Sequence, residues 1–400
     1  MHLSGNEGTS VKGYVFVSNS TKPSPDTAES REPVLTSNVN RPCLRAALAM
    51  GYEVFWGVNR NRPEELTCDL PVKMYDSHTY RSLFAFGDNR IAFRNLSKLL
   101  KENNVEVIHC NTPVGGLIGR LCGRVCRTKK VIYTVHGFHF YQGAPLLNRT
   151  VYKWAEQVMA RWTDAIITMN REDYAAAKKL RLRKGGKVYK VHGVGIDLAS
   201  FENIRGNRAA KRAELGLKDT DILCISAGDL VPRKNCGTAI KAIAKVKDPN
   251  LHYLICGVGP EEARLKKLAK ALGIEDRVHF AGFRTDMKEL MAAADIFLFS
   301  SLQEGLPRSL MEAMASGLPA VVSRIRGNVD LIEDGKGGIL CKPRDAADFA
   351  KAIRKMAKNA PLRRRMSENN RKVIRSYDAS VVQKEILSIY QQVLGAGRAR

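Results

Sequence analysis

The chain has 400 residues, more than a single hydrophobic core usually organises, so its length predicts two domains. Apolar residues make up 44% of the sequence and charged residues 26%, an ordinary globular composition that excludes a wholly disordered protein. The 65 Lys and Arg against 40 Asp and Glu leave a net charge of +25, which favours an anionic partner such as nucleic acid, a phosphorylated substrate or anionic lipid.

Cysteine usage indicates a reduced, cytoplasmic protein. The nine cysteines form no CxxC pair, and Cys110, Cys224 and Cys256 lie in apolar, strand-like runs where a thiol behaves as a small hydrophobic side chain. No run approaches the roughly 18 to 20 apolar residues that span a bilayer, and the polar first nine residues lack a signal-peptide core. We therefore expect any membrane contact to be made from the surface.

Short β-rich runs alternate with helical patterns along nearly the whole chain, which predicts parallel sheets with crossover helices. In the first half, strands are expected at residues 14–18, 52–58, 105–110, 130–135, 165–168 and 188–191. In the second half, they are expected at residues 222–227, 251–256, 278–280, 296–300 and 320–323. Several are apolar throughout, as expected for strands covered by helices on both faces.

A Gly-rich stretch at 192–197 marks the predicted boundary between two domains, 1–195 and 196–376, with a final helical segment over 377–400. Both domains are predicted to be α/β, Rossmann-like and doubly wound. Such domains carry their functional loops at the carboxyl ends of their strands, and we expect these loops to face each other across a central cleft that binds two substrates. Residues 19–37, rich in Ser, Thr and Pro, predict a long loop after the first strand.

The strongest local signal is EGLPRSLME at residues 304–312, which follows a predicted strand and opens a helix. Glu304 lies in the loop and Glu312 eight residues later in the helix. Backbone N–H groups at a helix start can bind a phosphate, and carboxylates beside them can accept hydrogen bonds from sugar hydroxyls. On spacing alone, two solvated carboxylates are the simpler interpretation.

This segment resembles the E-x7-E motif of the retaining glycosyltransferases of family four, which have the GT-B fold of two Rossmann-like domains facing a central cleft. Four other segments resemble motifs of that family in the same order. They are YTVHGF at 133–138, the acceptor-domain His loop in the form seen among capsule and exopolysaccharide enzymes; GDLVPRKN at 228–235, the diphosphate-binding segment; CGVGP at 256–260, the next strand end; and AGFR at 281–284, the base-binding loop. The resemblance runs from about residue 105 to the end, and five ordered motifs are far more specific than one.

The resemblance implies that Lys234, with Gly228 and Arg233, holds and neutralises the donor diphosphate. The nucleotide diphosphate leaves with developing negative charge, so cations fixed beside it lower the barrier. Many relatives carry an Arg five residues before the Lys, whereas Asp229 occupies that position here. Arg233 is therefore expected to substitute for it.

By the same resemblance, Glu304 binds the transferred sugar and Glu312 the ribose hydroxyls. The remaining donor-binding residues that it implies are Phe283, Arg284, Gly305, Leu306 and Pro307.

In the first domain, the resemblance implies that His136 contacts the donor sugar near the reacting carbon; a buried, hydrogen-bonded structural His is the competing interpretation. His139 is a weaker candidate for binding the acceptor. Gly115 and Gly116 open another helix and are candidates for the same role, with packing as the alternative.

Two patterns are discounted. Gly257 and Gly259 follow a strand as in a dinucleotide fingerprint, but Glu262 occupies the third glycine position. Asp219 and Asp221 form a DxD that precedes a strand, so it is predicted to be a solvated turn at the wrong end of the sheet. No metal and no cofactor are expected.

Together these features predict a retaining transferase that moves a hexose or N-acetylhexosamine from a nucleotide diphosphate sugar, with UDP as the expected nucleotide. The expected acceptor is a lipid-linked saccharide in capsule or exopolysaccharide synthesis. By resemblance, the last helix returns to the first domain. One alternative is an epimerase on the same scaffold. The other is a basic nucleic-acid-binding protein, which is disfavoured because the basic clusters lack interleaved aromatic residues and no nucleic-acid motif is present.

The basic surplus is concentrated in residues 101–200, which carry 17 Lys and Arg against 7 Asp and Glu. The first domain is therefore expected to dock peripherally on the anionic inner face of the plasma membrane. The helical pattern at 117–126 mixes an apolar stripe with Arg120 and Arg124, and it is interpreted either as an interfacial helix or as a core-facing one.

Overall fold

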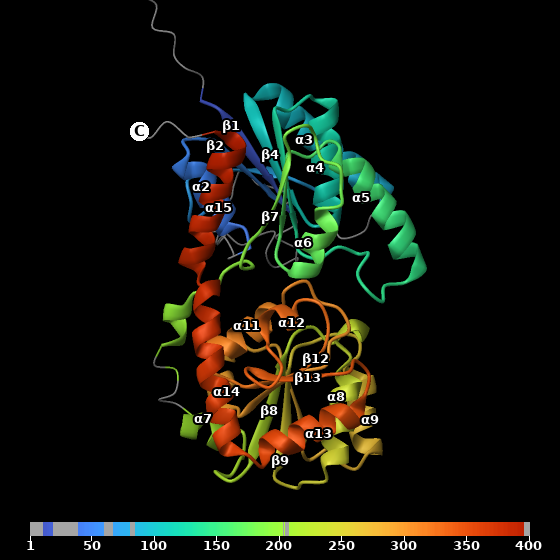
Figure 1. Cartoon of the computed structure of the whole chain (residues 1–400), viewed down its shortest axis with the longest axis vertical. Coiled ribbons are helices and arrows are strands. Elements are labelled where there is room, and N and C mark those ends of the chain that lie inside the picture. The colour runs from blue at the N-terminus through green and yellow to red at the C-terminus, as the bar shows by residue number, and fades with distance from the viewer. Residues whose placement is uncertain are drawn as a thin grey trace, which may run out of the picture. The chain divides into compact units, whose positions relative to one another are not determined.

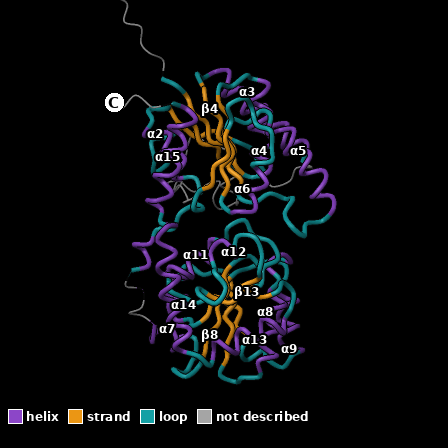
Figure 2. Tube along the Cα trace, viewed as in Figure 1, coloured by secondary structure: helices purple, strands orange, loops and turns teal. Residues whose placement is uncertain are grey.

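The computed structural model describes residues 11–18, 39–59, 67–80, 85–202, 204 and 208–395 (Figure 1). The predicted loop at 19–37 lies outside the described residues. The chain divides into two compact units. Unit 1 comprises Met1–Gly195 and Ser380–Arg400, and unit 2 comprises Ile196–Ala379. Each unit is built around one parallel sheet covered by helices, as Figure 2 shows.

Unit 1 contains a seven-stranded parallel sheet in the order β3-β2-β1-β4-β5-β6-β7, so the strand order reverses between β1 and β4. Its strands are β1 (Gly13–Val17), β2 (Glu53–Val58), β3 (Lys73–Asp76), β4 (Val105–Asn111), β5 (Lys130–Val135), β6 (Ala165–Thr168) and β7 (Lys187–Lys190). Its helices are α2 (Arg41–Ala49), α3 (Phe86–Glu102), α4 (Pro113–Val125), α5 (Lys153–Ala160), α6 (Arg171–Ala177) and α15 (Ala379–Leu394).

Unit 2 contains a six-stranded parallel sheet in the order β10-β9-β8-β11-β12-β13, with its reversal between β8 and β11. Its strands are β8 (Ile222–Ala227), β9 (Leu251–Cys256), β10 (Val278–Gly282), β11 (Ile296–Phe299), β12 (Ala320–Ser323) and β13 (Gly338–Cys341). Its helices are α7 (Arg208–Glu214), α8 (Cys236–Val246), α9 (Glu262–Ala271), α10 (Met287–Ala293), α11 (Arg308–Ala315), α12 (Asn328–Leu331), α13 (Ala346–Ala357) and α14 (Ala360–Val373).

Every strand predicted from the sequence coincides with an observed strand, and the prediction missed β3 and β13. Both are short edge strands. In β3 only Tyr75 is buried, so the apolar run that identifies a central strand is missing. β13 begins at Gly338, where a Cβ would lie 2.1 Å from the Ala320 carbonyl oxygen, so only glycine allows this close approach to β12. In a sequence, however, glycine usually indicates a turn and not a strand.

α15 packs on unit 1 through a buried polar network. The Tyr390 hydroxyl hydrogen-bonds with the Tyr14 hydroxyl at 2.6 Å and with Nδ1 of His109, whose Nε2 lies 2.7 Å from Thr134 Oγ1. Burial lowers the pKa of His109 to about 3, so the ring is neutral near pH 7. These bonds join the last helix to β1, β4 and β5.

α4 faces the core, and its interpretation as an interfacial helix is wrong. Ile118 and Cys122 are buried, and the fully buried Arg120 donates to both Glu156 carboxylate oxygens, at 2.6 and 3.0 Å. The Arg120 guanidinium also lies 3.9 Å from the centre of the Tyr133 ring. A buried, paired guanidinium is not available to an external surface. None of the helices in the described part of the chain is long and apolar enough to cross a membrane.

Candidate active site

In unit 2, the strand order reverses between β8 and β11, and in doubly wound sheets ligands bind at the carboxyl ends of strands beside such a reversal. Hydrogen bonds join the loops that leave these two strands. Leu302 N donates to the Arg233 carbonyl at 2.8 Å, Asn235 Nδ2 donates to the Ser300 carbonyl at 3.0 Å, and Ser300 Oγ donates to the Asn235 carbonyl at 2.8 Å. The two loops are thus held as one surface.

Glu304 is the centre of this surface. Its Oε1 accepts from Lys234 Nζ at 2.8 Å, from Arg233 Nη1 at 3.1 Å and from Ser301 Oγ at 2.7 Å, while Arg326 Nε donates to its carbonyl oxygen at 3.0 Å. No bond from a described residue reaches Oε2. The Glu304 and Lys234 side chains are only 11% and 12% exposed, so the interpretation of Glu304 as a solvated carboxylate is wrong. Two cations on one carboxylate leave a net positive charge suited to an anion.

Glycines shape the floor of the site at the ends of β8 and β9. Gly228 has φ +143°, and a Cβ there would lie 3.3 Å from Lys234 Cε. A Cβ at Gly257, which has φ +147°, would lie 2.1 Å from the Gly228 carbonyl oxygen. Lys234 Nζ also lies 4.7 Å from the centre of the Phe299 ring, within cation–π range. The lysine is therefore confined between backbone, ring and carboxylate.

The second carboxylate of the motif lies apart from this cluster. Glu312 is on α11, where its Oε1 accepts from Arg308 Nε at 2.9 Å. The segment Gly305, Leu306 and Pro307 leads into this helix, and no side chain caps its first turn. A Cβ at Gly327 would lie 2.4 Å from the Gly305 carbonyl oxygen, so the backbone that follows β12 packs directly against the backbone of this segment. Among the described residues, no hydrogen bond or ion pair joins Glu312 to the Lys234–Glu304 cluster, and the ribose role of Glu312 stays a prediction.

The predicted base-binding loop at 281–284 begins within β10, which ends at Gly282. Gly282 has φ +63°, and Phe283 projects into solvent with 78% of its surface exposed. Arg284 donates to both Asp286 oxygens, at 2.7 and 2.6 Å, and lies 3.2 Å from Glu214. The Arg284 guanidinium holds the pKa of the Asp286 carboxyl well below its usual range. The charge of Arg284 is thus used within the protein, whereas the Phe283 ring is free to stack on a base.

In unit 1, two buried polar atoms lack partners where β4 and β5 end. His136 Nε2 and Asn111 Oδ1 are buried, and neither bonds to a described residue. Burial lowers the pKa of His136 to about 4, so its ring is neutral near pH 7. They are two of nine buried polar side-chain atoms in the described part of the chain that lack a protein partner, and a water or a polar ligand would satisfy them. The sugar contact of His136 stays a prediction.

The three predicted acceptor residues have clear local contacts. A Cβ at Gly116 would lie 2.5 Å from the ring of Tyr133, so packing of α4 on β5 accounts for this glycine. Gly115 N donates to the capping residue of the same helix. His139 stacks on Tyr152 with ring centres 5.1 Å apart. An acceptor contact stays a prediction for all three.

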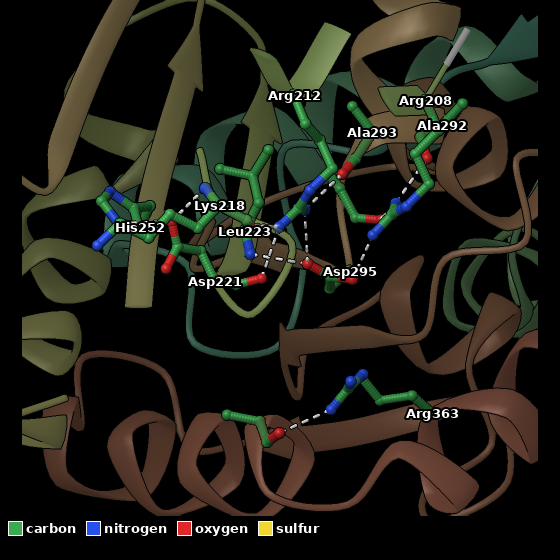
Figure 3. Close-up of polar contacts among 12 residues, drawn as sticks. Arg208, Arg212, Lys218, Asp221, Leu223, His252, Ala292, Ala293, Asp295 and Arg363 are labelled. Atoms are coloured by element: carbon green, nitrogen blue, oxygen red, sulfur yellow. Dashed lines mark hydrogen bonds and ion pairs between the residues drawn. The ribbon is translucent and has the colours of Figure 1, made fainter. Parts of the chain in front are cut away.

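The DxD pattern lies at the amino end of β8, as expected, but only Asp219 is exposed. Asp221 is buried, its Oδ2 accepts from Lys218 N at 2.7 Å, and its carbonyl accepts from Arg212 Nη2 at 2.7 Å (Figure 3). Arg212 also reaches Asp295 in the same network. The interpretation of Asp221 as a solvated residue is therefore wrong. The described residues contain no group of three or more His, Cys, Asp or Glu that could hold a metal ion.

Sequence reasoning missed Asn111 and Arg326. Asn111 ends a strand, and the next residue, Thr112, has φ +61° and ψ 160°, a strained conformation often found at functional sites. The only signal in the sequence was the polar step Asn-Thr-Pro after an apolar strand. Arg326 is buried beside Glu304 although it lies far from the recognised motifs. Its place could not be inferred without the fold.

Two Rossmann-like doubly wound domains, one with a Lys–Arg–Glu cluster at the reversal of its strand order, define a glycosyltransferase of the GT-B type. Comparison with known proteins agrees. The model of Glycosyltransferase Family 4 matches residues 43–198, and that of the glycosyl transferases group 1 matches residues 207–373. The chain belongs to the glycosyltransferases of family 4. This confirms the predicted family and fold class.

Three individual proteins illustrate the similarity. The putative glycosyltransferase EpsD of Bacillus subtilis is 35% identical over 307 residues, covering 76% of this chain and 80% of that protein. The UDP-Gal:alpha-D-GlcNAc-diphosphoundecaprenol alpha-1,3-galactosyltransferase of Escherichia coli is 30% identical over 264 residues, covering 65% and 68%. The crystal structure of Anabaena Alr3699/HepE in complex with UDP and glucose covers 96% of this chain and 100% of that one, with a TM-score of 0.75 and 19% identity, which shows the shared fold.

Proposed function

We propose that the protein transfers a hexose or N-acetylhexosamine, with retention of anomeric configuration, from a UDP-sugar to a lipid-linked saccharide at the inner face of the plasma membrane. The product would enter a capsule or exopolysaccharide. The observation that carries this proposal is the Lys234–Arg233–Glu304 cluster at the carboxyl ends of β8 and β11. The Escherichia coli relative, whose name specifies a UDP-linked donor and a diphosphoundecaprenol-linked acceptor, supports the same two substrate classes.

The cluster suggests how unit 2 handles the donor. In the free protein both cations bind one oxygen of Glu304. A diphosphate would draw Lys234 and Arg233 to its oxygens, stabilising the charge that develops as the nucleotide leaves. Glu304 would then accept hydrogen bonds from hydroxyls of the transferred sugar, starting with the free Oε2. The first-turn N–H groups of α11 would add donors for a phosphate.

In unit 1 we assign saccharide binding to His136 and Asn111. A neutral imidazole can donate or accept a hydrogen bond without adding charge, and the unpaired Asn111 oxygen accepts from a hydroxyl. Both groups would gain the partner that they lack in the free protein.

A thermal-shift panel of nucleotide sugars is the first test. A ligand at 100 times its dissociation constant stabilises the folded state by about 2.7 kcal/mol, and we expect this from a UDP-sugar. Incubation of the best donor with and without lipid-linked acceptor then separates the two enzyme classes. Glycosylated lipid with retained configuration is expected, whereas an epimerised sugar formed without acceptor would establish the alternative epimerase. If no nucleotide diphosphate sugar stabilises the protein, the proposal is wrong.

A further inference from the structure

The outer face of residues 145–161, called here the α5 segment, is unusually apolar. Four large side chains in it, Leu146, Leu147, Val151 and Trp154, are each more than half exposed, and Leu146 reaches 75%. They are four of the twelve exposed large apolar residues in the described part of the chain, and they lie within nine residues of one another. Scattered exposed apolar residues need no explanation, but a cluster of this kind marks an interaction surface.

The segment is helical and exposes apolar side chains on its outer surface. A π-helical turn, Asn148–Tyr152, runs directly into α5. Such turns are rare in proteins, and those that occur are often at functional sites. Leu147 precedes the π turn, Val151 lies in it and Trp154 follows it; all three are exposed, and together they are called here the apolar stripe.

The inner face is anchored to the core of unit 1. Glu156 binds the buried Arg120 of α4 through both carboxylate oxygens, and Met159 and Ala160 are buried. Figure 1 shows α5 beside α4. The apolar stripe is thus held on a fixed support.

The charges of the segment select the partner. Arg149, Lys153 and Arg161 are all exposed, and the single acid, Glu156, is already neutralised by Arg120. An exposed apolar surface with a tryptophan, beside three cations that pair with no acid among the described residues, has the composition of a helix that lies in the interface of an anionic bilayer. Tryptophan suits that position because its ring is amphipathic.

We propose that the α5 segment is the membrane-docking element of this protein, inserting Leu147, Val151 and Trp154 among anionic lipids. It replaces the α4 pattern, whose apolar and basic residues are used in the core. The inference deepens the proposed function, because a lipid-linked acceptor would require the enzyme at the bilayer. Apolar insertion adds a component to attachment that salt does not screen.

The test is co-sedimentation of the full chain with phosphatidylglycerol-containing and with phosphatidylcholine vesicles, from 0.1 to 1 M salt. We expect binding to the anionic vesicles to weaken with salt and to persist in part at 1 M. The triple variant Leu147→Gln, Val151→Gln, Trp154→Gln should lower partitioning about a hundredfold or more at every salt concentration. The variant Arg149→Gln, Lys153→Gln, Arg161→Gln should lower it about fivefold per charge at low salt and little at 1 M.

Matched controls separate this surface from the basic character of the whole protein. Replacing the exposed Lys351, Lys355 and Lys358 of the α13 region by Gln removes the same charge, and Phe86→Gln with Val125→Gln removes exposed apolar surface elsewhere. Both control proteins should bind vesicles as the unaltered protein does. Tryptophan emission should shift to the blue on vesicles, and Trp154→Phe should abolish that shift.

Unchanged vesicle binding by the apolar triple variant would overturn the inference. A second outcome would also overturn it: the unaltered protein does not bind vesicles, light scattering shows a dimer, and the apolar triple variant dissociates that dimer. A second copy of the chain would then occupy the stripe. Thermal shift with the nucleotide sugar serves as the fold control and should be equal in all variants. If the protein does not bind vesicles but the nucleotide sugar still raises its thermal stability, only the docking inference is wrong. If the protein binds vesicles but no nucleotide sugar raises its thermal stability, only the proposed function is wrong.

Discussion

Lys234→Ala is the substitution that most directly tests the donor site. Lys234 Nζ lies 2.8 Å from Glu304 and 4.7 Å from the centre of the Phe299 ring, and a Cβ on Gly228 would touch its side chain. A cation confined in this way is preorganised for the diphosphate, and loss of one such group costs about 10² to 10³ in turnover. In the free protein, the lost hydrogen bond to a carboxylate is worth about 1.5–3 kcal/mol, part of which Arg233 retains.

The assay compares nucleotides that differ only in phosphate. The base is chosen from the thermal-shift panel, and calorimetry then measures the dissociation constants of the nucleoside diphosphate and monophosphate. We expect Lys234→Ala to weaken the diphosphate about tenfold or more and the monophosphate much less. Arg233→Ala is the matched control and should cost less, since its side chain is 47% exposed and its charge is screened by solvent. Near-normal turnover, or equal losses for both nucleotides, would refute the diphosphate assignment of Lys234.

Four further predictions follow from contacts already described. Transfer should survive excess EDTA in a product assay, and recovery of lost activity by Mg²⁺ or Mn²⁺ would contradict this. Asp221→Ala should lower the free energy of unfolding in urea by about 1.5–3 kcal/mol, because the carboxylate of this buried residue accepts a hydrogen bond from a backbone N–H, whereas Asp219→Ala should be silent. Gly116→Ala should cost about 1–3 kcal/mol by overpacking the ring beneath it while leaving the nucleotide thermal shift unchanged; a neutral effect on stability would reject the packing role. Burial lowers the pKa of His109 to about 3 and of His136 to about 4, so below about pH 6.5 the unfolded chain binds protons that the folded protein does not. Stability should therefore fall from pH 6.5 toward pH 4 by up to about 1.4 kcal/mol per pH unit for each histidine, and in urea titrations at pH 7 and 5 His109→Gln should lose less than the unaltered protein.

Much of the candidate site could be predicted from the sequence because its residues belong to local motifs. Lys234 and Glu304 each follow a buried strand, and loops after parallel strands meet at one edge of the sheet. Their direct ion pair could not be predicted, since 70 residues separate them and the pairing depends on β8 and β11 being neighbours. For the same reason Arg326 and Asn111 were missed, because the surroundings of each depend on which strands are neighbours in its own sheet.

The sequence by itself determined the central strands and the parallel α/β class but not the edge strands β3 and β13, because strands covered on both faces must be apolar along their length and such runs are visible without any partner. Only the tertiary structure decided which charged and apolar side chains are buried. Arg120 and Asp221 have charges typical of surface residues yet lie in the interior, because the Glu156 carboxylate and the Lys218 backbone supply their partners. Trp154 is exposed because the inner face of α5 is the one that carries the Glu156–Arg120 ion pair. Whether a side chain is buried depends on its neighbours in space, and the fold determines which residues distant in the chain become neighbours.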